Sequence, residues 1–297
     1  KQQYPNHIQV LFVQADTLFS QGRLQEAQVF YDRMDQISNN HPLVPFQLGT
    51  FYLYSSDEPA KALSLLQEAL KRVEQHPDFG RTRVLHALMN AYLLTGDIEQ
   101  GAEIAKSLID DSEYYASAYR MVALNHSIKG EYADALKAYQ ALLTIHPELK
   151  DDQNLVSWYR RAYLEVTLEK DPENVPALLD LGQIVLEQTR PLPEPKSRNV
   201  GFGVAEQYFK DAQEIEPQNS LVFNRLGYLY MVWEKLDLAQ TALEQATRLK
   251  PDFIKAWYNL GLVYVQVGKP EQARKAWSKV LEFDVNHQGA RQGLATL

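Results

Sequence analysis

Residues that could support catalysis are few in this 297-residue chain and lie scattered along it. The seven histidines show no HExxH spacing, the arrangement that places two histidines on one helix face to bind zinc. No cysteine is present, so the chain has no thiolate nucleophile, thiolate metal ligand or disulfide. Gly201-Phe202-Gly203 is too short for a phosphate loop and follows a proline-rich segment rather than a strand. We therefore expect no enzyme, no metal site and no cofactor.

Other polar motifs have structural interpretations. The carboxylate pairs Asp110-Asp111 and Asp151-Asp152 fall at expected helix junctions, where negative side chains suit helix N-termini. Asn125-His126-Ser127 matches the glycosylation triplet but lies within an expected helix, so we discount it and interpret His126 as a packing residue.

Composition and charge limit the kinds of partner. The net charge is −8, which disfavours a nucleic-acid binder that works through bulk positive field. It divides into −11 over residues 1–219 and +3 over 220–297, and such asymmetry can orient an approaching partner. No stretch approaches the roughly 18 apolar residues of a membrane span. We expect no nucleic acid and no membrane insertion by this segment.

The start of the chain bears on its compartment. It begins with Lys1 rather than Met, and no signal-peptide pattern follows. This suggests that an N-terminal segment has been removed from a soluble domain in the cytoplasm or facing the periplasm.

A repeated pattern in the sequence indicates the secondary structure on which any binding residues lie. Two copies of one pattern lie 34 residues apart near the C-terminus: Phe223-x2-Leu226-Gly227-x2-Tyr230 and Trp257-x2-Leu260-Gly261-x2-Tyr264. Each is followed by a small residue, Ala239 or Ala273, on a second amphipathic stretch. This pattern resembles the tetratricopeptide repeat, in which two antiparallel helices pack through small residues. The resemblance covers most of the chain.

The fold class implied by the resemblance is all-α. We predict a right-handed α-solenoid of about seven helix-turn-helix repeats, with one odd helix and a C-terminal capping helix formed by residues 285–297. Glycines mark the turns within four repeats, and His-Pro, Glu-Pro or Lys-Pro pairs end the second helices of four. These positions are Gly22, Gly96, Gly130 and Gly268, and Pro77, Pro147, Pro217 and Pro251.

Two irregular segments set the predicted domain division. We expect an array of about four repeats over 1–149, an odd linking helix over 150–174, and about three repeats with the capping helix over 175–297. The odd helix is expected to bury a stripe of five residues, Trp158, Tyr159, Ala162, Tyr163 and Val166. A proline-rich insertion at 190–203 is expected to form an extended, solvated loop.

The resemblance also implies where a partner would bind, because the first helices of such repeats line a concave groove. Phe12 and Asp16 occupy positions where some family members hold a peptide carboxylate, and neither can do so. The predicted anchor for an acidic or amide-rich segment is instead a polar cluster with aromatic neighbours in the second to fourth repeats. The candidate partner-binding residues there are Phe46, Tyr54, Arg83, His86, Asn90 and Arg120, and in the last repeats Asn224, Tyr228, Lys255 and Tyr258.

Two functions remain open at this point. The first is a non-enzymatic scaffold that binds a peptide or helical segment of a partner protein and organises an assembly. The alternative is an accessory component of envelope secretion or polysaccharide export, whose array contacts a polymer or a membrane-embedded partner.

Overall fold

The chain folds into α-helices throughout the part that the structure describes. The structure, a computed structural model, describes residues 8–37, 41–56, 58–109 and 115–297, and within these ranges it contains sixteen α-helices, two 3-10 helices and no strand. Asp110 and Asp111 lie outside the described residues. The chain divides into two compact units, residues 1–151 and 152–297. The all-α solenoid class is confirmed, while the predicted three-part domain division stays a prediction.

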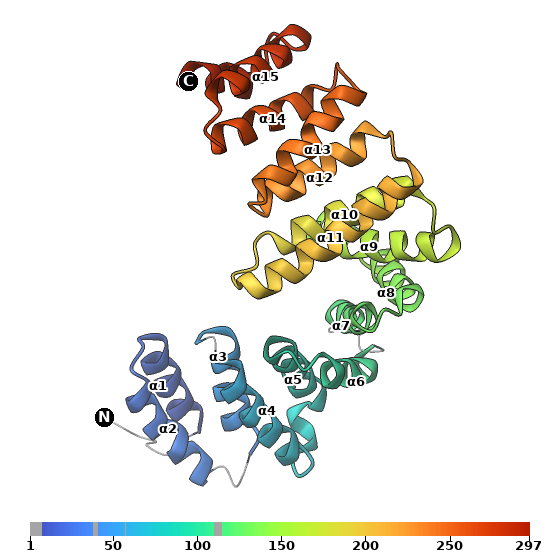
Figure 1. Ribbon diagram of the computed structural model, residues 1–297. Helices are drawn as coiled ribbons and strands as arrows, with labels where there is room; N and C mark the ends of the chain where they lie inside the picture. The colour runs from blue at the N-terminus through green and yellow to red at the C-terminus, as the bar shows by residue number, and fades with distance from the viewer. Residues whose placement is uncertain (1–7, 38–40, 57, 110–114) are drawn as a thin grey trace. The chain divides into compact units, whose positions relative to one another are not determined.

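Unit 1, residues 1–151, consists of four helix pairs in chain order, each pair packed as a hairpin (Figure 1). Two 3-10 helices follow the second and fourth pairs. The elements are α1 (Ile8–Ser20), α2 (Leu24–Ile37), α3 (Leu43–Tyr54), α4 (Pro59–Val73), η1 (Pro77–Phe79), α5 (Arg81–Thr95), α6 (Ile98–Leu108), α7 (Tyr115–Ile128), α8 (Tyr132–Ile145) and η2 (Pro147–Asp151).

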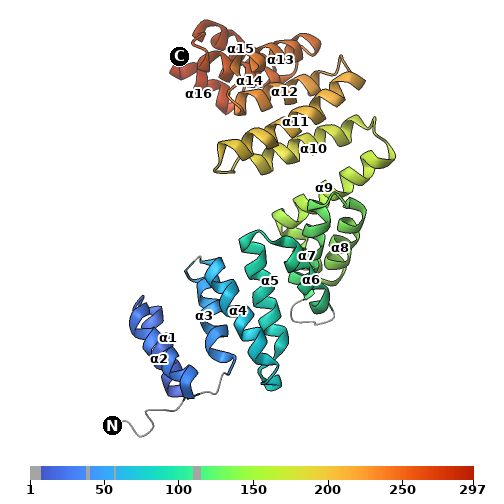
Figure 2. The same cartoon turned by 60° about the horizontal axis from the view of Figure 1, so that its bottom comes forward.

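Unit 2, residues 152–297, consists of three helix pairs with one further helix at each end (Figure 2). The first, α9, packs against α10, and the last, α16, packs against α15 as the predicted capping helix. The elements are α9 (Gln153–Lys170), α10 (Val175–Thr189), α11 (Pro195–Ile215), α12 (Ser220–Val232), α13 (Leu236–Leu249), α14 (Ile254–Gln266), α15 (Pro270–Phe283) and α16 (Gln288–Thr296).

The predicted turns and helix ends are confirmed. All four turn glycines have φ between 72° and 83°, the left-handed region that glycine adopts without steric cost. The four prolines follow the ends of α4, α8, α11 and α13. Asp152, from one of the carboxylate pairs, caps α9 by accepting hydrogen bonds from the backbone N–H groups of Asn154 and Leu155.

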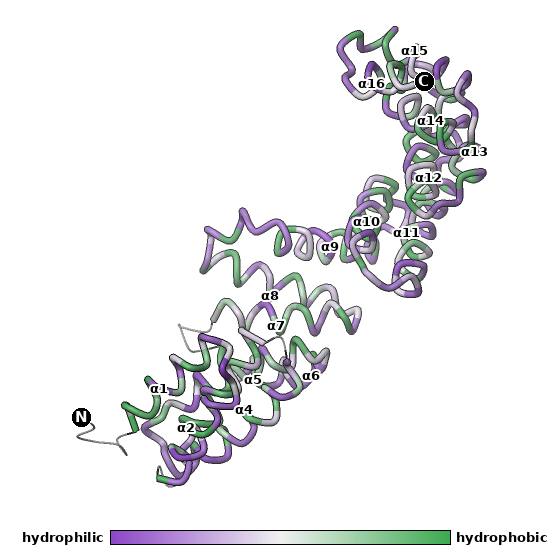
Figure 3. Tube along the Cα trace, turned by 90° about the vertical axis from the view of Figure 1, so that its left-hand side faces the viewer, coloured by the Kyte–Doolittle hydropathy of each residue, from purple (hydrophilic) through white to green (hydrophobic). Residues whose placement is uncertain are grey.

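Small residues on the first helices make room for large side chains from the second helices. A Cβ added to Gly182 would overlap the Phe209 ring, and one added to Gly261 would overlap Trp277. Both large side chains are buried. Figure 3 shows hydrophobic and hydrophilic residues interspersed along the helices of both units.

The prediction of an extended loop over 190–203 is wrong for residues 195–203, which form the first turns of α11. Pro195 lies in the first helical turn, where its missing N–H leaves no hydrogen bond unmade. Phe202 is buried, and Gly201 lies so close to Thr189 of α10 that a Cβ would overlap the threonine side chain. The insertion is therefore a helical extension packed on the preceding helix.

The buried stripe predicted for the odd helix is also partly wrong. Trp158 and Tyr163 of α9 are exposed, with 38% and 53% of their surface accessible. The face toward α10 and α11 runs instead through Leu164 and two charged residues. Arg161 donates to Gln188, and Glu165 accepts from the Tyr208 hydroxyl, so this face combines hydrogen bonds with the apolar contacts of Leu164.

Candidate functional site

The link between α4 and α5 places a basic side chain over two aromatic rings. Pro77–Phe79 form η1, and Gly80, with a φ of 86°, turns the chain into α5. Arg83 lies in the first turn of α5, and its guanidinium carbon is 3.9 Å from the centroid of the Phe79 ring. The Phe46 ring of α3 lies 5.6 Å from the same carbon.

The two rings form a fixed platform for this arginine. Their centroids are 5.5 Å apart in an edge-to-face arrangement, and Phe79 is 6% exposed. Among the described residues no carboxylate pairs with Arg83, which is itself exposed. A guanidinium held over rings contributes roughly 0.5–2 kcal/mol and keeps its donors free for a ligand.

A hydrogen-bonded bridge lies next along the same two helices. The Asn90 Nδ2 atom donates to the Tyr54 hydroxyl at 3.0 Å and lies 3.4 Å from His86 Nε2. Tyr54 is 60% exposed although it is aromatic. The bridge joins α3 to α5 and holds the Asn90 amide in place. The Oδ1 atom of that amide accepts no hydrogen bond from the described residues.

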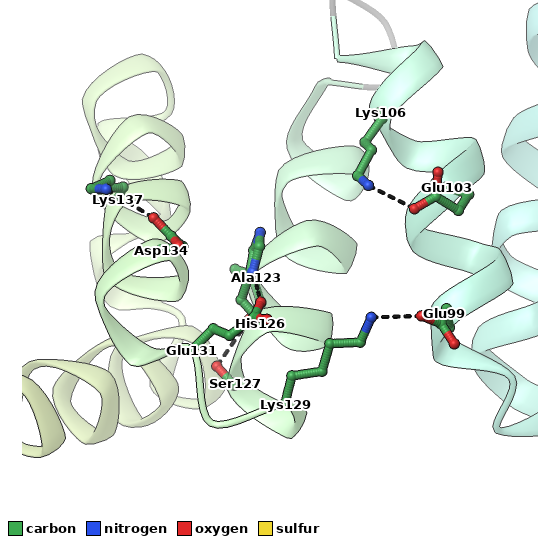
Figure 4. Close-up of polar contacts among 10 residues, drawn as sticks. All are labelled: Glu99, Glu103, Lys106, Ala123, His126, Ser127, Lys129, Glu131, Asp134 and Lys137. Carbon is green, nitrogen blue, oxygen red and sulfur yellow. Dashed lines mark hydrogen bonds and ion pairs between the residues drawn. The ribbon is translucent and has the colours of Figure 1, made fainter.

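Arg120 lies exposed on α7, the first helix of the fourth repeat. Two polar contacts lie at the other end of α7 (Figure 4). Lys129 Nζ lies 2.6 Å from Glu99 of α6, and His126 Nδ1 lies 2.5 Å from Glu131 in the α7–α8 turn. The exposed Lys129–Glu99 ion pair contributes about 0–1 kcal/mol. The interpretation of His126 as a packing residue stays a prediction.

Unit 2 arranges the polar residues of its first helices differently. We define the polar ladder as four hydrogen-bonded pairs that cross between helices α9, α10, α12 and α14. Their separations lie between 2.5 and 3.3 Å. The pairs are Arg160–Asp180, Arg161–Gln188, Arg225–Gln183 and Asn259–Asn224.

The predicted binding residues of unit 2 are largely engaged within the unit. Asn224 belongs to the ladder and is 6% exposed. Tyr258 is half-buried, and its ring centroid lies 4.8 Å from that of His287, which caps α16. Tyr228 accepts a 3.5 Å hydrogen bond from Arg190, and Lys255 is exposed. The structure brings the unit 1 candidates into contact more fully than those of unit 2.

Family models match the end of the chain. The tetratricopeptide repeat model matches residues 254–287, and a second model described as TPR repeat matches residues 234–268. These ranges cover α13, α14 and α15, where the helix pairs have the repeat spacing found in the sequence. Residues 234–287 therefore contain tetratricopeptide repeats.

The curated relatives of the chain match different shares of it. It is 25% identical to tetratricopeptide repeat protein 21A of Mus musculus over 96% of this chain and 21% of that protein. It is 32% identical to the Hsp70-Hsp90 organizing protein of Triticum aestivum over 32% of this chain and 16% of that protein. The chain therefore spans less than a quarter of these curated relatives, as it does of others that it matches.

Among solved structures, a thermophilic tetratricopeptide repeat protein of Thermus thermophilus matches with 17% identity and a TM-score of 0.41. The match covers 86% of this chain and 97% of that one.

Two features of the structure were not predicted from the sequence, the ring under Arg83 and a pocket beside α11. Phe79 follows a helix-ending proline, and its role as a platform for Arg83 depends on the η1 turn. Arg190, Arg198 and Trp233 surround a pocket that exists because residues 195–203 are helical. The Gly201-Phe202-Gly203 sequence could have indicated close helix packing, since Gly201 lies against Thr189.

The tyrosines at the repeat positions are structural in the last two repeats. Burial, followed by hydrogen bonding to Glu206, raises the pKa of Tyr230, and burial with Glu244 raises that of Tyr264 in the same way. Both tyrosines thus remain protonated and bind the preceding repeat. The described residues contain no group of three potential metal ligands, and no described helix combines the length and apolar character of a membrane span.

Proposed function

We propose that this chain is a non-enzymatic interaction module that binds a peptide or helical segment of a partner protein along α3, α5 and α7 and so organises an assembly. The bound segment is acidic or amide-rich and carries apolar side chains. The wheat relative, whose name describes the organisation of two chaperones, supports a role of this kind.

The observation that supports this site best is Arg83 on its aromatic platform. A guanidinium without a carboxylate partner among the described residues can form paired hydrogen bonds with a ligand carboxylate. Its position is fixed before binding, so little side-chain entropy is lost when the ligand arrives. Asn90, held by Tyr54, offers a carbonyl oxygen to a backbone N–H of the same segment.

The test is capture of the partner by charge-reversed variants. Wild-type protein is used to capture partners from native extract, which mass spectrometry identifies, and the identified segment is then titrated against purified variants. Arg83→Glu combined with Arg120→Glu is expected to weaken binding at least tenfold, because two attractive contacts become repulsive, each worth about 1 kcal/mol or more.

A matched control separates groove charge from overall charge. Lys71→Glu with Lys106→Glu makes the same net change on the second helices α4 and α6, where both lysines are exposed. The proposal requires that this control bind as wild type and that both double variants keep the wild-type circular dichroism spectrum. Equal binding by the two double variants would show that the platform is only a solvated surface.

A further inference from the structure

The helical extension at the start of α11 creates a pocket that the repeat pattern alone does not provide. The pocket has a volume of about 540 Å³ and lies where α11 meets the α12–α13 turn and the end of α14. Its wall is fixed by the Phe202 and Trp233 rings, with centroids 5.6 Å apart, and by a 2.9 Å hydrogen bond from Trp233 Nε1 to Asn199. The two contacts join the extension to the next repeat.

Two guanidinium groups face this pocket without an acidic partner among the described residues. Arg190 donates only a long hydrogen bond to Tyr228, and Arg198 has no side-chain partner in the same part of the chain. Lys235, outside the lining, has its Nζ 3.1 Å from the centroid of the Trp233 ring. The one carboxylate that lines the pocket belongs to Glu234. A positive pocket in a chain of net charge −8 favours an anionic ligand.

The remaining lining is apolar and aromatic. Phe202, Met231, Val232 and Trp233 contribute a surface that can take a hydrophobic side chain. The volume falls within the roughly 300–1,000 Å³ typical of ligand pockets. The pocket therefore combines an apolar anchor with donors that recognise the geometry of a carboxylate.

We propose that this pocket binds a short segment of a partner protein in which a carboxylate lies next to an apolar side chain. The proposal rests on the proposed function only in that the occupant is a protein segment. The residues differ, since they come from the α11 extension and the α12–α13 turn. A nucleic acid is the poorer match, because Glu234 and the negative charge of the chain repel a polyanion.

The experiment follows the Trp233 indole N–H in the whole protein by nuclear magnetic resonance. The chain has four tryptophans, and Trp233→Phe assigns the resonance. The probe is the peptide acetyl-Glu-Leu-Glu-Leu with a free C-terminal carboxylate, added to about 1 mM, the range of a weak single-site interaction. The expected result is a saturable shift of the Trp233 resonance.

Variants that remove arginine charges, and a probe without carboxylates, test whether the pocket recognises the carboxylate. Arg190→Gln with Arg198→Gln is expected to weaken probe binding at least tenfold while the circular dichroism spectrum stays unchanged. Arg274→Gln with Lys275→Gln, at exposed positions on α15, removes the same number of charges outside the pocket and is expected to bind as wild type. The probe acetyl-Gln-Leu-Gln-Leu amide, which lacks carboxylates, is expected to bind at least tenfold more weakly than the acidic probe.

Three outcomes would overturn the proposal: no shift at Trp233, an equal affinity in the double arginine variant, or an equal response to inorganic phosphate, which would indicate a general anion site. The measurement is independent of the native partner. Arg83→Glu with Arg120→Glu should leave the Trp233 response intact, so a failure of the unit 1 site and a failure of this pocket give different results.

Discussion

In unit 2, Arg225 and Arg161 donate hydrogen bonds to glutamines of α10, whereas in unit 1 Arg83 lies over two phenylalanine rings. Both arrangements use arginines near the first helices of neighbouring repeats. The ladder in unit 2 engages one terminal N–H group of Arg161 and one of Arg225 within the unit and so joins the repeats to one another, although the buried Nε of each has no hydrogen-bond partner among the described residues. The platform in unit 1 leaves its donors available, which is the arrangement that a ligand site needs.

The two units also differ in how regularly their helix pairs pack. In unit 2 each of the three pairs places a glycine of the first helix against a large side chain of the second. Among the described residues of unit 1 only Gly49, against Leu66, repeats this arrangement. Gly101 of α6 instead faces the Met121 side chain of α7, which belongs to the next pair. The family models match residues 234–287, within this more regular unit.

The tryptophans provide a way to measure the units separately. All four, Trp158, Trp233, Trp257 and Trp277, lie in unit 2. Tryptophan fluorescence during urea unfolding therefore reports unit 2, while circular dichroism reports both units.

The largest expected effect follows from the buried ring in the α11 extension. Phe202→Ala should reduce the free energy of unfolding of unit 2 by about 3 kcal/mol, because it removes the contact with Trp233 and leaves a cavity. Val200→Ala, at an exposed position in the same helix, should change it by less than about 0.5 kcal/mol. A near-zero effect of Phe202→Ala by tryptophan fluorescence would mean that residues 195–203 do not pack.

This extension shows where sequence reasoning ends. Turn glycines such as Gly96 and helix-ending prolines such as Pro217 act locally, so their roles can be predicted from the sequence. The buried face of α9 depends on Arg161 and Glu165 meeting Gln188 and Tyr208, partners more than 20 residues away. Hydrophobic periodicity cannot reveal that charged residues share a buried face with apolar ones such as Leu164.

The candidate site was predictable to a similar extent. The repeat frame placed Arg83 and Asn90 on one first helix, and the structure confirms their shared helix α5. It gave no information on Phe79, whose ring reaches Arg83 only through the Pro77–Phe79 turn and the positive φ of Gly80. The role of these residues in binding stays a prediction.

A second pair of variants tests the difference in packing. Gly261→Ala should destabilise unit 2 by about 2 kcal/mol, because the new Cβ overlaps buried Trp277. Gly101→Ala in unit 1 meets the flexible end of Met121 at 3.0 Å, so its cost should stay below about 1 kcal/mol. Equal losses, measured by fluorescence for the first and circular dichroism for the second, would contradict the proposed difference.

The next test removes one acceptor from each unit. Gln183→Leu takes away the partner of Arg225 Nη1, which lies 2.7 Å from the Gln183 oxygen, and should cost unit 2 about 1–2 kcal/mol. Tyr54→Phe takes away the partner of Asn90, but water can replace the exposed hydroxyl, so unit 1 should lose less than about 0.5 kcal/mol. A larger loss for Tyr54→Phe would show that the unit 1 bridge has a structural role.

Acid should act on unit 1 before unit 2. Burial, then the nearby charges of His76 and Arg83, lowers the pKa of His41 below its usual value of 6.5. The neutral ring also accepts a 3.1 Å hydrogen bond from the Leu43 N–H, which protonation removes. The unfolded chain therefore binds a proton more readily, and the stability from this group, complete above pH 6.5, declines as the pH falls below it.

The measurement is the unfolding midpoint of unit 1 by circular dichroism between pH 7 and pH 5, where we expect a modest decrease. His41→Gln should flatten this dependence. The fluorescence midpoint of unit 2 serves as the internal reference and should move less over the same interval. An unchanged pH dependence in His41→Gln would assign the effect to other groups.

The smallest effect concerns the turn beside the pocket in unit 2. Glu234 has a φ of 61° and lies 34 residues before Gly268, whose φ is 72°. The two turns make the same hydrogen bond, since the backbone N–H groups of Lys235 and Lys269 donate to the carbonyl oxygens of Tyr230 and Tyr264 at 2.8 Å.

A left-handed conformation costs a residue with a side chain about 1–2 kcal/mol, whereas a glycine gives the unfolded state roughly 0.4–1 kcal/mol of additional conformational entropy. Glu234→Gly should therefore stabilise unit 2 by about 0.5 kcal/mol in fluorescence-monitored unfolding. Gly268→Ala, which introduces the same strain into the neighbouring turn, should act in the opposite direction. If Glu234→Gly destabilises the unit instead, the carboxylate makes an interaction at the pocket that outweighs the strain of its backbone.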